Sequence, residues 1–154
     1  MITGKYPSLR LRRNRKFSWT RRLVRENDLS SNDLILPIFL TEGNKKKTKI
    51  PTMPGIFRYS IDMLPKIIDQ ALSNKIPMIA FFPHTPQSKK NNIGSESLNE
   101  NNLVCRALKI SKQRYKNEIG LMTDVALDPY TSHGHDGLLK NNKILNDETL
   151  DILV

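Results

Sequence analysis

The sequence predicts a mixed α/β fold in which parallel strands alternate with helices. Two short apolar runs, 34–40 and 76–82, are bounded by polar or turn residues, as expected for strands buried on both faces. A third run at 119–127 ends in an acidic loop. Helical patterns separate the three runs, so the order strand, helix, strand, helix, strand indicates a parallel α/β sheet or barrel.

Both helices are predicted from apolar residues that recur three and four positions apart. In residues 62–74 these side chains share one helical face, and Pro65 fits the first turn if Asp62 is the N-cap, because that turn contributes no N–H to the helix. Residues 100–115 show the same spacing. Pro37 fits the first predicted strand poorly, because a proline has no backbone N–H to donate to the hydrogen bonds between strands.

Length and composition favour one soluble domain. The chain has 154 residues, of which 38% are hydrophobic. No apolar run approaches the roughly 18 residues of a membrane span. The single cysteine, Cys105, has no partner for an internal disulfide and cannot build a thiolate zinc site. We therefore expect a cytoplasmic protein without a membrane partner.

Residues 1–30 are predicted to form a basic arm, separate from a domain over 31–154. Residues 1–25 hold nine lysines and arginines and no acid, within a chain of net charge +10. Such an arm could neutralise nucleic-acid phosphates while Tyr6, Phe17 and Trp19 stack on bases, or it could be a transit peptide. It could equally wrap another subunit or remain a solvated tail.

The segment DVALDPYTSHGHDG, residues 124–137, gathers three carboxylates and two imidazoles directly behind the third predicted strand. A loop that only turns the chain needs Gly, Pro, Asn or Ser rather than acids and histidines. In parallel α/β folds, ligands bind at the carboxyl ends of strands. We therefore expect a functional site in this loop, with His84 behind the second strand as a further candidate.

The last residues predict another helix. Residues 146–148 provide a cap and first-turn acids, and Leu150 and Leu153 begin an apolar face. Three strands with their helices also leave two sheet edges and the interior of a barrel unfilled. We therefore expect this chain to be the front part of a longer protein or to depend on a partner that completes it.

Four stretches of the sequence resemble one enzyme family. They are RLRRNRKFSWTRRLVREN (10–27), DLILPIFLTEG (33–43), IPTMPGIFRYSID (50–62) and the loop DVALDPYTSHGHDG. These stretches resemble porphobilinogen synthase, also called delta-aminolevulinic acid dehydratase. The resemblance implies a TIM (β/α)₈ barrel, of which a chain of this length can hold only the first three or so βα units, truncated at the third helix. It also implies an arm that embraces a neighbouring subunit, commonly in a homo-octamer.

The resemblance implies an activity as well. The family condenses two molecules of 5-aminolevulinate into porphobilinogen, with loss of two waters, in haem and tetrapyrrole biosynthesis. The covalent step is assigned to two Schiff-base lysines late in the barrel, and such a lysine needs a depressed pKa. None of the fifteen lysines here lies within an apolar strand run, so we expect this chain alone to be inactive.

Roles within the acidic loop also follow from the resemblance. Zinc-using members carry three cysteines at places that match Ala126, Asp128 and Asp136, so zinc is not expected. The aspartate-rich type uses Asp128 and Asp136 to anchor the amino group of the substrate, and these acids also suit magnesium or a monovalent cation. Asp124 would order water and protons as the catalytic residue. The loop would be shaped by Tyr130, Thr131, Ser132, His133 and His135.

The resemblance also implies a regulatory magnesium site at a subunit interface of the complete enzyme. Two alternatives come from other functional classes. A metal-dependent hydrolase would use the aspartates and histidines of the loop around a divalent ion and its activated water. A nucleic-acid-binding module would act through the basic arm, with an affinity that falls steeply with salt. Neither explains IPTMPGIFRYSID, and we favour the arm as a subunit contact over a nucleic-acid contact.

Overall fold

The computed structural model describes residues 4–154 and divides into two compact units, Met1–Ser30 and Ser31–Val154. The first unit contains a 3₁₀ turn, η1 (Arg13–Arg15), and a short helix, α1 (Ser18–Leu23), neither of which has a buried residue. Phe17 and Trp19 stack with their ring centroids 6.3 Å apart, yet Trp19 remains 58% exposed. The arm therefore leaves its apolar side chains largely uncovered within its own unit.

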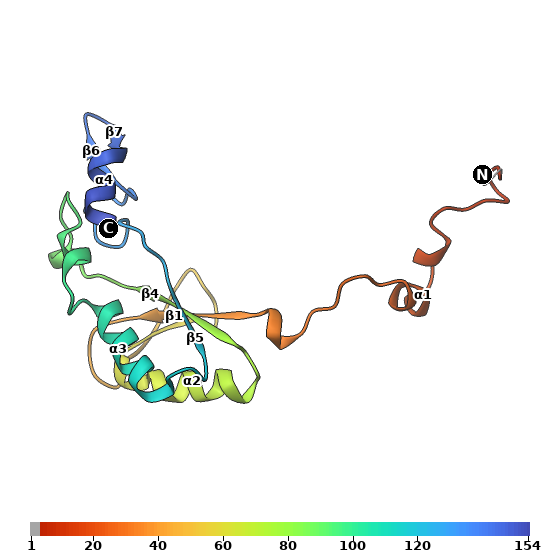
Figure 1. Ribbon diagram of the computed structural model, residues 1–154, viewed down its shortest axis with the longest axis horizontal. Helices are drawn as coiled ribbons and strands as arrows, with labels where there is room; N and C mark the ends of the chain where they lie inside the picture. Colours follow the sequence, from red (N-terminus) through yellow and green to blue (C-terminus); the bar gives the residue numbers. More distant parts are fainter. Residues whose placement is uncertain (1–3) are drawn as a thin grey trace. The chain divides into compact units, whose positions relative to one another are not determined.

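The second unit is built on a five-stranded sheet with the order β2-β3-β1-β4-β5 (Figure 1). The strands are β1 (Ile35–Leu40), β2 (Lys47–Lys49), β3 (Phe57–Tyr59), β4 (Met78–Pro83) and β5 (Gly120–Thr123). β1 runs parallel to both β3 and β4, β4 runs parallel to β5, and β2 pairs antiparallel with β3. The three predicted strands are confirmed as β1, β4 and β5, although β5 ends at Thr123 rather than Leu127.

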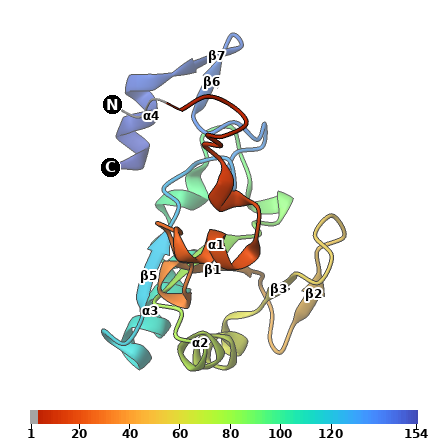
Figure 2. The same cartoon turned by 90° about the vertical axis from the view of Figure 1, so that its right-hand side faces the viewer.

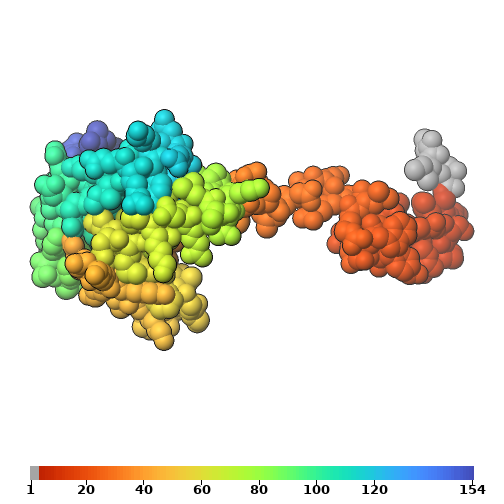
Figure 3. Space-filling model, turned by 90° about the horizontal axis from the view of Figure 1, so that it is seen from below, coloured from red at the N-terminus to blue at the C-terminus, as the bar shows by residue number. Residues whose placement is uncertain are grey.

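Two helices cover one face of this sheet. α2 (Leu64–Ser73) connects β3 to β4, and α3 (Leu103–Tyr115) connects β4 to β5. Figures 1 and 2 both show them on the same side of the sheet, and Figure 3, seen from that side, shows α2 in yellow next to α3 in cyan. Asn102 caps α3, because its side-chain oxygen accepts the Cys105 backbone N–H at 2.9 Å.

The hydrophobic core lies between these helices and the sheet. Ile38 and Leu40 of β1 and Ile79 and Phe81 of β4 are each at most 2% exposed and belong to one buried cluster with residues of α2 and α3. Because successive side chains of a strand point to opposite faces, the alternate residues of β1 and β4 point the other way. They line a face that α2 and α3 leave open.

The structure corrects the prediction for the start of α2. Asp62 is not the N-cap: the helix begins at Leu64, and the Asp62 carboxylate instead accepts the Lys45 backbone N–H at 2.8 Å. Pro65 does occupy the first turn. Pro37 is tolerated in β1 because the register between β1 and β3 begins only at Phe39, so that side of the strand is not paired at residue 37.

Beyond β5 the acidic loop leads into a hairpin and a helix. β6 (Leu138–Lys140) and β7 (Lys143–Leu145) pair across Asn141 and Asn142, which both have the positive φ that a two-residue hairpin turn requires. α4 (Asn146–Leu153) starts at Asn146 with no side-chain cap, so the cap predicted there is wrong. Thr149 Oγ1 accepts the Leu138 N–H at 3.0 Å and ties α4 to β6. None of the helices in the described part of the chain has the length and apolar character to cross a membrane.

Candidate active site

Strand register places four side chains in a line across the open face, at the carboxyl ends of the parallel strands. Arg58 of β3 pairs with Phe39 of β1, and Phe39 pairs with Phe82 of β4. The register of β4 with β5 makes Asp124, the first residue after β5, the neighbour of Phe82. The rings of Phe39 and Phe82 lie 5.7 Å apart between centroids. We call these four residues the cross-strand row: a cation and a carboxylate at its two ends, with aromatic rings between them.

A cavity of about 210 Å³ lies at this row. It is lined by Phe39, Arg58, Phe82, Pro83, His84, Asp124, Asp128, Pro129 and Tyr130. These residues come from β1, β3, β4 and the two loops that follow β4 and β5. Apolar walls with a few converging polar groups are typical of sites for small molecules, so this cavity is the candidate site.

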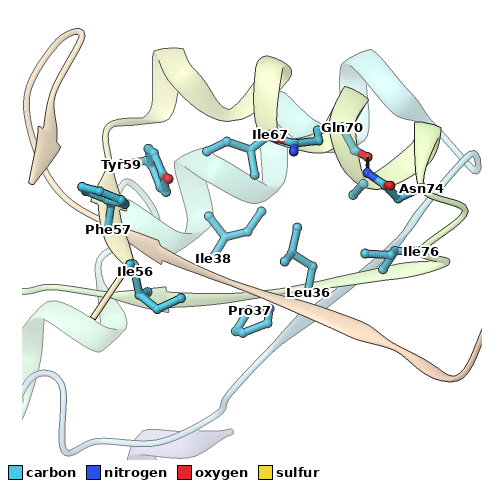
Figure 4. Close-up of a pocket in the computed structure, with 12 residues that line it drawn as sticks. Leu36, Pro37, Ile38, Ile56, Phe57, Tyr59, Ile67, Gln70, Asn74 and Ile76 are labelled. Carbon is cyan, nitrogen blue, oxygen red and sulfur yellow. Dashed lines mark hydrogen bonds between the residues drawn. The ribbon is translucent and has the colours of Figure 1, made fainter. Parts of the chain in front are cut away.

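A second pocket, of about 240 Å³, lies between β1 and α2 on the helix-covered side (Figure 4). Leu36, Ile38 and Ile67 are among the side chains around it, and Gln70 and Asn74 supply polar atoms. None of the described residues that line this pocket is an acid, a histidine, a lysine or an arginine. It is a gap in apolar packing beside the unpaired part of β1 and offers no group for charge or proton chemistry.

Asp128 reaches the candidate site from the acidic loop, and its pKa is raised. Burial is the largest cause, followed by the negative charges of Asp136 and Asp124. Lys90 opposes this shift, and its Nζ donates to the Asp128 carbonyl oxygen at 3.5 Å. A cationic ligand would relieve the repulsion among the three carboxylates, so the site favours a positively charged group.

Asp136 is held by the backbone of its own loop. Its Oδ1 accepts the Leu127 N–H at 2.7 Å, and its side chain is not part of the cavity lining. The negative charge of Asp136 still contributes to the raised pKa of Asp128, after the larger effect of burial. The structure thus brings Asp124 and Asp128 to the cavity and keeps Asp136 within electrostatic range of Asp128. Their assignment to catalysis and to the amino group of a substrate stays a prediction.

His84 lies on the positively charged side of the cavity. Its pKa is lowered, first by burial and then by the charges of Arg58, Lys90 and Lys46. Its backbone N–H donates to the Leu40 carbonyl at 2.9 Å, which fixes the chain just beyond β4. The imidazole is therefore neutral at neutral pH and can accept or relay a proton.

The loop residues predicted to shape the site join the acidic loop to the loop behind β4. Ser132 Oγ donates to Asn92 Oδ1 at 2.6 Å, and His133 Nε2 lies 3.2 Å from the Asn92 carbonyl oxygen. Thr131 Oγ1 donates to the His135 carbonyl at 2.9 Å, and the His135 backbone N–H donates to His133 Nδ1 at 3.1 Å. Both contacts of His133 are satisfied when its proton is on Nε2. The hydroxyls of Thr131 and Ser132 and both ring nitrogens of His133 are therefore engaged in contacts that hold the loop together.

Tyr130 forms part of the cavity wall. It is 8% exposed, and burial raises its pKa to about 12, so its hydroxyl stays protonated at neutral pH. Its carbonyl accepts the Asn91 N–H at 3.3 Å. Asn91 and Asn92 were not among the predicted site residues; their only signal in the sequence is an Asn-Asn pair, a residue type that forms turns.

None of the lysines in residues 4–154 is buried. Lys90 is half-buried and the other lysines are exposed. The pKa of Lys89 is raised, first because its Nζ donates to Glu96 at 2.9 Å. A raised pKa keeps an amine protonated, which is the opposite of what imine formation needs.

Across residues 4–154, no three His, Cys, Asp or Glu side chains are grouped so that they could hold a metal ion. Asp136 is engaged with the Leu127 N–H, and His133 with Asn92. The acidic loop therefore does not fit a resident metal site by itself. Among the described residues there is thus no ligand cluster of the kind that the activated water of a metal-dependent hydrolase requires.

Comparison with known proteins now identifies the relatives of this chain. The delta-aminolevulinic acid dehydratase family matches residues 8–154. This chain belongs to that family. Among curated members, the delta-aminolevulinic acid dehydratase of Bradyrhizobium diazoefficiens is 51% identical over 147 residues, which cover 96% of this chain and 41% of that protein. The delta-aminolevulinic acid dehydratase of Ruminiclostridium josui is 38% identical over 144 residues, or 94% of this chain and 69% of that protein.

A solved member of the dehydratase family has the same fold over this region. It is the delta-aminolevulinic acid dehydratase (porphobilinogen synthase) of Toxoplasma gondii ME49 in complex with the reaction product porphobilinogen, with a TM-score of 0.85 and 38% identity. The match covers 94% of this chain and 41% of that one. The predicted fold class, the first βα units of a TIM (β/α)₈ barrel, is confirmed. The chain spans about two fifths of the length of the first curated relatives it matches.

Proposed function

We propose that this chain supplies the ammonium-binding side of a 5-aminolevulinate site, in a protein that condenses two molecules of 5-aminolevulinate into porphobilinogen with loss of two waters. The observation that carries the proposal is the cavity at the carboxyl ends of the strands, which both Asp124 and Asp128 line and where the pKa of Asp128 is raised, first by burial and then by the charges of Asp136 and Asp124. A primary ammonium supplies both the positive charge and the hydrogen-bond donors that these acids lack.

The three aspartates have different roles in this proposal. Asp128 binds the substrate ammonium directly, and Asp136 adds negative potential while its Oδ1 holds the Leu127 N–H. Asp124 lies closest to the sheet, at the end of β5, and exchanges protons with the substrate or with water during the loss of the two waters. The neutral imidazole of His84 is the other proton-transfer group of the cavity.

The covalent step needs an amine that is unprotonated at neutral pH, and no described lysine of this chain is buried. We therefore propose that this chain alone binds substrate without forming an imine. Incubation with 5-aminolevulinate and borohydride, followed by intact-mass analysis, is expected to give no stoichiometric adduct. A single adduct that maps to one lysine, such as Lys90, whose Nζ lies 3.5 Å from the Asp128 carbonyl oxygen, would contradict this part of the proposal.

The complete enzyme is proposed to be a cytoplasmic homo-oligomer, an octamer by resemblance, assembled through the basic arm without nucleic acid or membrane partners. The family is generally metal-dependent. We propose that the complete enzyme uses magnesium, or a monovalent cation, at a subunit interface outside the acidic loop. Zinc is not proposed, because Ala126, Asp128 and Asp136 stand where zinc-using members carry cysteines. Support for the subunit role of the arm comes from unit Met1–Ser30, whose two short helical elements bury no residue.

The proposal is tested by titrating 5-aminolevulinate into the chain and measuring its dissociation constant by calorimetry. Asp128→Asn keeps the size of the side chain but removes its charge, and is expected to weaken binding about tenfold or more, because hydrogen bonds to charged groups contribute roughly 1.5–3 kcal/mol. Asp151→Asn, at an exposed position on α4, is the matched control and should bind like the unmodified chain. Equal dissociation constants for both variants would refute the role of Asp128.

A further inference from the structure

We propose that Asn91 and Asn92, in the loop between β4 and α3, are positioning residues that hold residues 128–133 of the acidic loop at the wall of the candidate site. Neither asparagine belongs to the lining of the cavity, so both act on a ligand only through the loop that they hold. The inference rests on the proposed function for what is positioned, the carboxylate of Asp128, and its test separates the two.

The side chain of Asn91 shapes a turn in its own loop. Its Oδ1 accepts the backbone N–H groups of Ile93 at 3.2 Å and Ser95 at 3.1 Å, and its Nδ2 donates to Ser95 Oγ. An asparagine that binds the backbone ahead of it in this way stabilises a turn without regular secondary structure. The turn therefore fixes the direction of the backbone at Asn91.

The backbone of Asn91 pairs with the acidic loop like a short parallel strand. Its N–H donates to the Tyr130 carbonyl at 3.3 Å, and its carbonyl accepts the Ser132 N–H at 3.0 Å, so that Asn91 and Thr131 form a parallel bridge. The Thr131 side chain points inwards and is only 1% exposed. A slip of one residue would turn this side chain to solvent, so the pairing defines the register of the acidic loop.

Asn92 extends the contact by one residue. Its Oδ1 accepts the Ser132 hydroxyl at 2.6 Å. Its carbonyl accepts the Nε2–H of His133 at 3.2 Å, since Nδ1 of that ring is the acceptor for the His135 N–H. Replacing the Asn92 side chain removes the first of these two bonds and leaves the second, so the contribution of the side chain can be measured separately.

The two loops also pack against each other at Gly94. This residue is buried and has a φ of +63°, a conformation that favours glycine. A Cβ atom at Gly94 would lie 3.4 Å from the Thr131 side chain and 3.6 Å from those of Leu127 and Tyr130. The turn that Asn91 stabilises is therefore in close contact with the loop that it positions.

Charged side chains connect this turn to the body of the domain. Lys89 Nζ donates to Glu96 at 2.9 Å within the loop and lies 3.7 Å from Glu42, which follows β1. Glu42 also pairs with Arg106 of α3. These pairs are partly exposed and each contributes little stability. Together they link the turn at Asn91 to β1 and α3, two elements of the folded core.

A measurement without ligand tests the contact itself. In the unmodified chain, the Ser132 amide is expected to exchange its hydrogen with solvent about tenfold or more slowly than the amide of Gly134, after correction for their intrinsic rates. Gly134 is an exposed residue of the same loop. Equal corrected rates would overturn the inference without any substitution.

Binding of 5-aminolevulinate then shows whether the contact positions the site. Both asparagines are exposed, so replacing them opens no cavity in the core. Asn92→Ala removes the acceptor of the Ser132 hydroxyl and is expected to weaken binding about threefold, as for the loss of one hydrogen bond. Ser132→Ala should weaken binding to the same extent, and the double variant no further, because both substitutions remove one shared bond. Additive losses would show that Asn92 does not act through Ser132.

Substitutions at Asn91 test the turn. Asn91→Ala should speed exchange of the Ser132 amide and move the pKa of Asp128 towards its ordinary value, because burial is the largest cause of its rise. Asn91→Asp keeps an acceptor for the two backbone N–H groups and should restore the slow exchange. Asn99→Ala is the matched control: the Asn99 side chain accepts the Asn101 N–H at 3.0 Å and donates to Glu96, both within its own segment. It should leave exchange and binding unchanged.

The outcomes distinguish the inference from the proposed function. If 5-aminolevulinate binds, but Asn91→Ala and Asn92→Ala change neither its affinity nor the pKa of Asp128, the positioning role is overturned and the ammonium site stands. If exchange at Ser132 and the pKa of Asp128 change as expected, but the unmodified chain binds no 5-aminolevulinate, the ammonium site fails and the positioning of the loop stands. If a variant fails to fold, the exchange rates of the unmodified chain decide.

Discussion

The two faces of β1 and β4 differ in the side chains that they present. On the face that α2 and α3 cover, Ile38, Leu40, Ile79 and Phe81 form an almost fully buried apolar core. On the open face, one residue away along the same strands, Phe39 and Phe82 lie between a guanidinium and a carboxylate. The first face stabilises the fold, and the second carries the chemistry that we assign to this member of the dehydratase family.

This difference predicts opposite effects for two adjacent phenylalanines. Phe81→Ala removes a side chain that is 1% exposed and should lower the free energy of unfolding by about 3–5 kcal/mol, the usual cost of a large cavity in a core. Phe82→Ala should cost clearly less stability but weaken 5-aminolevulinate binding. Urea unfolding and calorimetric titration of both variants measure the two quantities. Equal loss of stability in the two variants would mean that the faces are not divided as we describe.

Binding to the open face should depend on pH through Asp128. Its pKa is raised above 3.8 in the folded chain, first by burial, so its carboxylate is present at neutral pH and becomes protonated as the pH falls through this raised pKa. The affinity for a cationic ligand should therefore fall with acidification. The imidazole of His84, whose pKa is lowered first by burial, gains a positive charge when the pH falls further, which acts in the same direction.

The methyl ester of 5-aminolevulinate is the ligand for this measurement, because its own charge stays constant between about pH 4 and pH 7. Its dissociation constant should rise about tenfold as the pH is lowered from about 7 to about 4. Asp128→Asn should make the dissociation constant less dependent on pH. A dissociation constant that is independent of pH in the unmodified chain would show that no carboxylate binds the ligand.

The basic arm should contribute to assembly and little to the stability of the second unit. Deleting residues 1–28 removes apolar side chains that are largely exposed, such as Trp19 at 58%, so the unfolding free energy of unit Ser31–Val154 should change by no more than about 0.5 kcal/mol. The mass of the assembly, measured by light scattering, should decrease. Trp19→Ala should reproduce part of this decrease if the contact is apolar. An unchanged mass together with salt-sensitive RNA binding that is lost in the deletion would favour the nucleic-acid alternative.

Periodicity was sufficient to predict the helix-covered face. The apolar runs and helical spacings predicted β1, β4, β5, α2 and α3, because burial imposes a repeating pattern on the side chains that face a core. β2 and β3 have only three residues each, which is too short to show a period, so the sequence pattern does not predict them. The hairpin of β6 and β7 was missed as well, although Asn141 and Asn142 are typical of its turn.

The candidate site could be predicted only in part. The density of acids in residues 124–137 pointed to Asp124 and Asp128, and the parallel order of the strands placed them at a carboxyl edge. Arg58 escaped notice because its place beside Phe39 depends on strand pairing, which no local pattern reveals. The hydrogen bond from Leu127 to Asp136 likewise depends on the path of the loop.

The central claim is that 5-aminolevulinate binds on the open face, and a crystal structure of the chain with this ligand tests it most directly. We predict electron density for the ligand in the cavity of about 210 Å³, with its nitrogen within hydrogen-bond distance of Asp128 or Asp124. A ligand found instead in the apolar pocket between β1 and α2, or with its nitrogen away from both carboxylates, would contradict the account.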